Sequence, residues 1–347
     1  MKKKMIVAAY IAVFMILGTL AISAANAGVF YRTSTNTDNV LKASKEFISI
    51  KKNLPMFKNI RLFGICRVEI KYGEYCRIEV SGPENYVNNM SYKVKDYTLN
   101  VSMDDNYAYS VDDKSKEFPH IVIYIPELIK IVKCNLGDVS VSSDVQIENL
   151  WAINDSMSNL ALGNIDCNSV VMDLKSGGSI NAGDIKVNTS FTCKNSSMGN
   201  LILGTVYANK FYMSLSSGGN MQVKDIEVKQ SVECKNSSMG KIKMNNVTCS
   251  NLEIELSSGG DIVANDIVCR ENARYENSSM GEIKTNTIRC DNECDIYLSS
   301  GGDFTAYQVV ANRLSCTSSS IGEIKIKNAD VKKYSQNAKN GNVSINY

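Results

Sequence analysis

The sequence predicts an all-β fold, a single-stranded parallel β-helix, from three observations. Two short motifs alternate along the chain with a combined period of 41 residues. Apolar residues recur at fixed places between the motifs, and they follow the period of two that is typical of strands. An α-helical solenoid would need apolar spacings of three and four over long stretches, which this sequence lacks.

The tripeptide Ser-Gly-Gly and the pentapeptide Asn-Ser-Ser-Met-Gly mark the repeat. The first motif occurs at 176–178, 217–219, 258–260 and 300–302. The second occurs at 195–199, 236–240 and 277–281, with degenerate copies at 154–158 and 318–322. The two series interleave about half a period apart, so each 41-residue repeat consists of two coils of 20–21 residues.

Apolar columns define what each coil buries. Three positions after the motif centre stand Val139, Leu160, Ile180, Leu201, Met221, Ile242, Ile262, Ile283, Phe304, Ile324 and Val343. Eight positions after it stand Ile165, Ile185, Val206, Ile226, Val247, Ile267, Ile288, Val309 and Ala329. Coils stacked about 4.8 Å apart would turn these columns into ladders, and eleven aligned units would make a rod of about 50 Å.

The two motifs are predicted to form the corners of the coils. Glycine pairs can supply the positive φ of a turn, and Ser, Asn and Asp can bond the turn backbone. This structural interpretation is favoured over a binding role for the motifs.

The first residues resemble an export signal. Lys2 to Lys4 precede an uncharged stretch, 5–22, and Ala25 and Ala27 form a small-residue cleavage site. We predict a signal peptide over 1–27; the alternative is a membrane anchor formed by 5–22, near the lower length limit of about 17 residues for a span. Export across the inner membrane, to the cell surface or the periplasm, follows in either case.

The remaining chain divides into three parts. Residues 28–54 are predicted to be a linker that leads into the fold, 55–134 an N-terminal β cap with the first coils, and 135–347 the repetitive β-helix. Within the cap, 65–70 and 76–80 are expected to pair like a hairpin, and 104–118 to be a loop. The chain ends on a strand-like sequence, an uncapped edge through which the C-terminal coil could self-associate.

A family resemblance supports this division. The segment FKNIRLFGICRVEIKYGEYCRIEVSG, followed by YTLNVSM, IVIYIPELIKI and GDVSV, resembles the opening of the putative auto-transporter adhesin "head GIN domain" family. The resemblance covers about 55–347 and includes the later glycine turns. It implies a right-handed, pectin-lyase-like β-helix exported by Gram-negative bacteria, with no catalytic residues to carry over. The chain differs from many such proteins because it has no lipid-anchor cysteine; its first is Cys66.

The eleven cysteines are predicted to be buried thiols. Seven fall in or near columns otherwise occupied by small or apolar residues: Cys167, Cys249, Cys269, Cys290, Cys193, Cys234 and Cys316. A disulfide within the stack of Cys249, Cys269 and Cys290 and a metal site are the less favoured alternatives, because in-register Cβ atoms strain a disulfide and an apolar ladder has no room for an ion.

The recurring acids are predicted to belong to a turn ladder. Asp184, Asp225 and Asp266 recur every 41 residues, as do turn acids such as Asp261 and Asp303. Acids of one column would lie two coils apart, about 9.6 Å, which is too far to share one Ca²⁺. The intervening positions are Asn164, Thr205, Asn246 and Thr287.

No residue is assigned a catalytic, cofactor-binding or metal-binding role. The chain has one histidine, His120, which excludes any site that needs two imidazoles, and its net charge of +2 gives no sign of nucleic-acid binding. We interpret His120 as structural or superficial. The single tryptophan, Trp151, could stack on a sugar if exposed but is expected to cap a coil.

The sequence therefore predicts an exported, non-enzymatic cell-envelope protein of adhesin type that presents its β-helix surface to an unknown glycan or protein. A membrane contact is expected only through an uncleaved N-terminal segment. Two alternatives remain: a polysaccharide lyase or hydrolase of pectin-lyase-like shape, and a structural envelope component.

Overall fold

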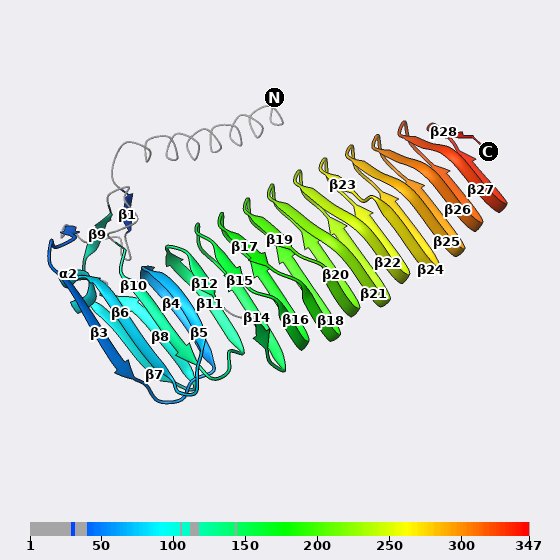
Figure 1. Ribbon diagram of the computed structural model, residues 1–347. Coiled ribbons are helices and arrows are strands. Elements are labelled where there is room, and N and C mark those ends of the chain that lie inside the picture. The colour runs from blue at the N-terminus through cyan, green and yellow to red at the C-terminus, as the bar shows by residue number, and fades with distance from the viewer. Residues whose placement is uncertain (1–28, 32–39, 105, 112–117, 143, 347) are drawn as a thin grey trace, which may run out of the picture.

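The structure is a computed structural model that describes residues 29–31, 40–104, 106–111, 118–142 and 144–346. It is a nearly all-β solenoid of about 10 turns, seen as a rod of stacked coils in Figure 1. The predicted parallel β-helix is therefore confirmed. The predicted signal peptide or anchor lies outside the described residues. Within the described part of the chain, no helix is long and apolar enough to cross a membrane.

The described residues of the N-terminal part form ten strands and one short helix. They are β1 (Val29–Tyr31), β2 (Val40–Lys42), β3 (Phe47–Asn53), β4 (Asn59–Ile65), β5 (Arg67–Tyr72), β6 (Arg77–Pro83), α2 (Glu84–Asn88), β7 (Met90–Lys95), β8 (Thr98–Met103), β9 (Ala108–Val111) and β10 (His120–Ile125).

The coils of the solenoid follow. Their strands are β11 (Lys130–Leu136), β12 (Val139–Val141), β13 (Val145–Gln146), β14 (Asn149–Asn154), β15 (Leu160–Leu162), β16 (Ile165–Leu174), β17 (Ser179–Ala182), β18 (Ile185–Asn195), β19 (Asn200–Leu203), β20 (Val206–Leu215), β21 (Asn220–Asn236), β22 (Lys241–Leu256), β23 (Asp261–Val263), β24 (Asp266–Asn277), β25 (Glu282–Leu298), β26 (Asp303–Ser318), β27 (Glu323–Ala338) and β28 (Asn342–Ile345).

The cap extends the same two faces that the solenoid uses. On one face, β11 pairs in parallel with β4, β4 pairs in parallel with β8, and the antiparallel β7 lies outermost. On the other face, β12 pairs in parallel with β5 and β5 with β10, and the antiparallel β6 and β3 close the edge. The first coil therefore rests on paired strands and not on solvent.

Two expectations for the cap are wrong. The segments 65–70 and 76–80 do not pair as a hairpin, because β10 lies between β5 and β6: Ile121 pairs with Val68 on one side and with Val80 on the other. The stretch 104–118 is not all loop, because it contains β9, which joins β1 and β2 in a three-stranded sheet. In addition, β3 lies within the predicted linker 28–54 and pairs with β6.

The predicted columns are inward ladders. Ile185, Val206 and Ile226 stand directly above one another, as do Leu201, Met221 and Ile242. These residues join a single hydrophobic cluster that extends from Phe57 in the cap to Ala329 near the C-terminus. Because each coil buries its apolar residues only against its neighbours, the stack as a whole provides the core.

A further inward ladder explains why the period is 41 and not 20 residues. Along it, leucine and asparagine alternate from coil to coil: Leu174, Asn195, Leu215, Asn236, Leu256, Asn277 and Leu298. The fully buried Asn236 donates from Nδ2 to the carbonyl oxygens of Gly240 (2.9 Å) and Asp261 (3.2 Å). Its Oδ1 accepts from the backbone N–H and the hydroxyl of Ser238. Each asparagine thus closes its own corner and bonds the next one.

The expected reason for the glycine pairs is wrong. Among the described glycines, only Gly64, Gly82 and Gly137 have positive φ, and none of them belongs to a Ser-Gly-Gly corner. Instead, the N–H of Gly219 donates to the carbonyl oxygen of Ser197 in the preceding coil (3.0 Å). A Cβ on Gly219 would overlap backbone atoms of that coil, so glycine is required there by close contact between coils.

Candidate functional site

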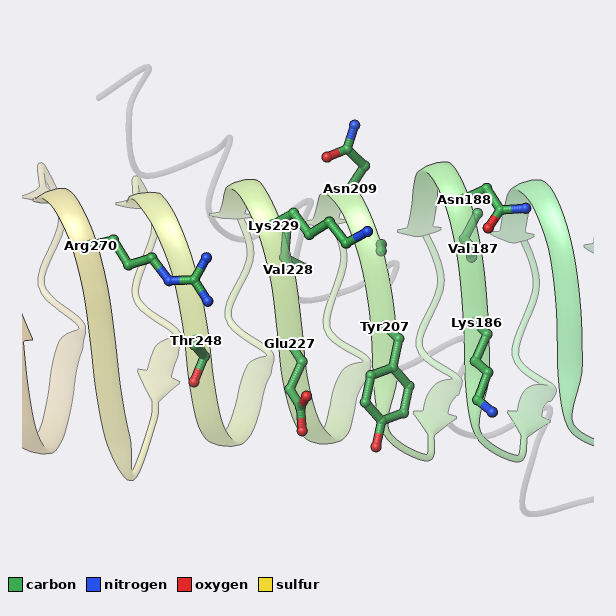
Figure 2. Close-up of a pocket in the computed structure, with 11 residues that line it drawn as sticks. Lys186, Val187, Asn188, Tyr207, Asn209, Glu227, Val228, Lys229, Thr248 and Arg270 are labelled. Atoms are coloured by element: carbon green, nitrogen blue, oxygen red, sulfur yellow. The ribbon is translucent and has the colours of Figure 1, made fainter.

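A groove with a volume of about 410 Å³ lies on one flank of the rod. Its lower row of side chains, Lys186, Tyr207, Glu227 and Thr248, comes from four successive coils in register. Its upper row, two residues further along, includes Asn188, Asn209 and Lys229 from the first three of these coils and Arg270 from a fifth, as Figure 2 shows. The buried residues Val187, Ala208 and Val228 lie between the rows and form its floor.

The flank owes its shape to a bend that alternates in length. The inward Ile185 and Phe191 are six residues apart along the chain, whereas Val206 and Phe211 in the next coil are five apart. Ile185 nevertheless pairs in register with Val206, and Phe191 with Phe211. The register between neighbouring coils therefore shifts at this bend. An extra residue in alternate coils acts as a β-bulge, which bends the strand and redirects its outward side chains.

A second recess, of about 230 Å³, continues the groove toward the cap. Lys186 lines both, and the recess adds Asp144, Asn164, Asp166 and Asp184. The two parts differ in charge. Lys186, Lys229 and Arg270 outnumber Glu227 in the groove, whereas three carboxylates surround Lys186 in the recess. A long polar ligand could therefore use donors at one end of the flank and acceptors at the other.

The acids of the predicted turn ladder bond from coil to coil. Asp184 Oδ1 accepts the backbone N–H of Thr205 (2.8 Å), and Asn164 Oδ1 accepts that of Asp184 (2.9 Å). In the same way, Asp225 Oδ1 accepts the N–H of Asn246 (3.2 Å). These oxygens bond the backbone of the next coil. Among the described residues, no group of three or more histidines, cysteines and acids is arranged to hold a metal ion.

The cysteines are free thiols, and all except the partly exposed Cys134 are buried. Burial raises the pKa of Cys66 and of Cys316 to about 12, so both thiols stay protonated near neutral pH. Cys249 and Cys269 stack in register, with 3.7 Å between their sulfur atoms. Because the thiolate is the reactive form, these side chains act as small apolar groups of the core.

The remaining predicted candidates lie apart from the groove. His120 is exposed at the start of β10 in the cap. Trp151 does not cap a coil: it projects from β14, 48% exposed, with the ammonium group of Lys130 at 5.3 Å from its ring centroid. The structure does not bring these two residues together with the acids of the recess.

A buried lysine was not found by sequence reasoning. Lys133 is fully buried, and its Nζ donates to the hydroxyls of Ser156 and Ser158 (both 2.6 Å) and to the carbonyl oxygen of Asn135 (3.1 Å). Burial lowers its pKa to about 8. Lys133 pairs in register with Leu62 of the cap on one side and with Asn154 on the other, so it belongs to the ladder that asparagine and leucine continue and closes its first corner.

The groove was missed as well. Its side chains are the outward residues of each coil, where the repeat imposes no residue type, so no recurring motif marks them. The sequence holds one signal for it. The number of residues from the column of Ile185 to that of Phe191 is six in some coils and five in others, and this difference shows where the coils change length.

Comparison with known proteins gives one family match. Residues 56–230 match the family described as "Putative auto-transporter adhesin, head GIN domain". No curated protein matches the chain in sequence.

Several solved structures resemble the chain. A putative adhesin from Parabacteroides distasonis aligns over 89% of this chain and 100% of its own, with 14% identity and a TM-score of 0.42. A putative adhesin from Bacteroides fragilis aligns over 88% and 100%, with 18% identity and a TM-score of 0.35. A putative lipid binding protein from Parabacteroides distasonis aligns over 89% and 100%, with 13% identity and a TM-score of 0.36.

Proposed function

The chain belongs to the putative auto-transporter adhesin, head GIN domain family, and from this premise we propose that it is an exported, non-catalytic binding protein of adhesin type that holds a glycan along its grooved flank. The observation that carries the proposal is the groove itself. Hydrogen-bonding side chains from successive coils line it, and Tyr207 presents an exposed ring among them.

This lining suits a sugar polymer. Hydroxyl groups pair with both donors and acceptors, which Lys186, Asn188, Glu227 and Arg270 supply. The ring of Tyr207 offers an amphipathic surface on which the apolar face of a sugar can stack. Equivalent side chains on successive coils follow the rod axis, so an extended chain can make many weak contacts.

Export to the cell surface is part of the proposal. It is supported by the family and by the signal-like sequence at 1–27. The coil surface then faces the medium, where glycans of other cells or of a matrix are accessible.

The test is a glycan array probed with the full-length protein and two double variants. We expect Tyr207→Ala/Arg270→Ala to bind its best glycan at least about tenfold more weakly, a loss of about 1.4 kcal/mol. The matched control is Tyr297→Ala/Lys243→Ala, because Tyr297 is 38% exposed against 37% for Tyr207 and neither control residue lines the groove. Equal losses in both variants, or no glycan binding by the wild type, would contradict the proposal.

The same preparation separates binding from catalysis. Incubation with acidic polysaccharides should leave their chain length unchanged in size-exclusion chromatography. Shortening of the polymer that Asp166→Asn or Asp184→Asn abolishes would instead identify a lyase or hydrolase that uses the carboxylates of the recess.

A further inference from the structure

One corner of the rod carries a row of exposed apolar side chains, which we call the methionine stripe: Met157, Met198, Met239, Met280 and Ile321. Their exposed fractions lie between 73% and 83%. They occur in every second coil, so neighbours lie about 9.6 Å apart and the stripe is about 38 Å long. Side chains scattered singly need no explanation, but a regular row of five on one edge is typical of an interaction site.

The coils between them carry a glycine at the same position. Gly218 lies in register between Met198 and Met239, because Asn195 pairs with Leu215 and Leu215 with Asn236. Gly177, Gly259 and Gly301 occupy the equivalent places. A Cβ on Gly177, Gly218 or Gly259 would meet no atom within 4 Å. A Cβ on Gly301 would touch the side chain of Ile321 at 3.5 Å, so the place above this glycine is partly covered. The stripe is therefore a row of projections separated by three open notches and one that is partly covered.

We propose that the methionine stripe pairs with the same stripe of a second copy of this chain, each projecting side chain entering a notch of the other. In the joined stripes, one side chain would stand about every 4.8 Å, the spacing at which side chains of neighbouring strands contact one another in a sheet. A knob and a hole of equal period on one surface are self-complementary. This inference does not depend on the glycan proposal.

An antiparallel arrangement closes the pair. A two-fold axis uses the same patch on both copies and stops at a dimer, whereas a parallel pair shifted by one coil has no closed symmetry and leaves one end of each stripe uncovered. Four projecting side chains of each copy face a glycine, three of them at an open notch, when Met239 faces Gly259 of the second copy. In that register Met198 faces Gly301, Met280 faces Gly218 and Ile321 faces Gly177.

Charge favours this register. Two residues after the stripe stand Lys241 and Asp261, which form an exposed ion pair of 3.8 Å within one chain. With Met239 opposite Gly259, Lys241 of each copy lies next to Asp261 of the other. Opposite charges therefore meet twice across the two-fold axis. A shift by two coils that brings Met239 to Gly301 would instead oppose Glu282 and Asp261.

A lipid surface is the less favoured occupant. Asp261, Glu282, Asp303 and Glu323 follow the stripe at successive coils, and an anionic membrane would repel them. The residues beside the methionines are serines and glycines, whose small size permits close approach of a second rod. They offer little apolar area that a bilayer could bury.

Sedimentation velocity of the full-length protein from about 1 to about 500 µM tests the proposal. The contact is narrow, so we expect a reversible dimer that forms with rising concentration. Met198→Ser/Met239→Ser/Met280→Ser should remain monomeric. Gly218→Leu/Gly259→Leu should also lose the dimer, because it fills the notches, although it adds apolar surface. Unchanged melting temperatures would show that both variants are folded.

Charge variants test the register. Lys241→Glu should weaken the dimer at least about threefold, and Lys241→Glu/Asp261→Lys should restore it. A wild-type protein that stays monomeric at all concentrations overturns the proposal, as does a dimer that both stripe variants retain. Association with vesicles of phosphatidylcholine and phosphatidylglycerol that Gly218→Leu/Gly259→Leu increases would identify the membrane as the occupant and equally overturn it.

Discussion

Adjacent glycines of one corner are under different constraints. Gly219 donates its N–H to the preceding coil and has no room for a Cβ, whereas Gly218 faces open space. Neither has positive φ. The repeated dipeptide therefore combines one residue fixed by contact between coils with one that leaves the outer surface bare.

This difference predicts opposite effects of the same substitution. Gly219→Ala should lower the free energy of unfolding by about 3 kcal/mol, because the methyl group forces the coils apart. Gly218→Ala should leave stability unchanged or raise it by up to about 1 kcal/mol, because it restricts the unfolded chain. Equilibrium denaturation in urea measures both, and a similar loss at the two positions would contradict the contact explanation.

The buried Lys133 makes stability depend on pH in a predictable direction. Its folded pKa, about 8, lies below the usual value of 10.5, so the unfolded chain binds more protons between these values and stability rises with pH across that window. We expect the free energy of unfolding of the wild type, relative to Lys133→Met, to increase by about 3 kcal/mol from pH 7 to pH 10.5.

Taking the difference between these two proteins removes the contribution of the cysteines that do not interact with Lys133; Cys66 and Cys134, which do, still contribute to it. Burial raises the pKa of thiols such as Cys167, to about 11, so their contribution is lost as pH rises above about 9 in both proteins. Urea denaturation at several pH values in the presence of a reductant measures the difference. A difference independent of pH would show that folding does not lower the pKa of Lys133.

At the scale of the element, the unit of the fold is a pair of coils. One coil places asparagine in the corner ladder and the next places leucine, so that each asparagine can bond the carbonyl oxygen of the coil that follows it. The apolar columns were predictable because all their residues belong to one class, apolar side chains. The role of asparagine was not, since its partners are 4 and 25 residues away and belong to different coils.

A deletion that removes a whole pair of coils should therefore be tolerated better than one that removes a single coil. Removing 200–240 joins Gly199 to Lys241 and keeps the alternation of asparagine and leucine, so we expect a shorter rod with a melting temperature within a few degrees of the wild type. Removing only 220–240 eliminates Asn236 and stacks Leu256 on Leu215. That chain should melt well below the longer deletion by circular dichroism, and the reverse order would contradict the paired unit.

At the scale of the whole molecule, the methionine stripe and the groove lie on different sides of the rod. From Gly177 on the corner to Lys186 in the groove is nine residues, about half a coil, so the methionine stripe and the groove occupy different sides of each coil. A dimer joined along the stripe would leave both grooves open. Two grooves on one particle raise avidity for a polymeric ligand without any new contact.

Location on the cell surface can be tested without knowing the ligand. A membrane-impermeant amine reagent should label exposed lysines of the coils, such as Lys186, Lys210 and Lys243, on intact cells. Peptide mapping by mass spectrometry identifies the labelled positions, and broken cells provide the control for reactivity. Labelling only after cells are broken would place the rod in the periplasm and contradict the surface proposal.

The sequence by itself determined the coil length, the inward columns and the corner positions, because a solenoid repeats its local environment and stacking demands the same residue class at each turn. Only the tertiary structure decided what depends on neighbouring coils or distant strands. It placed β10 between β5 and β6, and it showed that the second glycine of a corner is required by contact and not by φ. It also placed Lys133 in the first corner and assembled the groove from outward side chains, since these arrangements join residues about 20 or more positions apart that no local pattern connects.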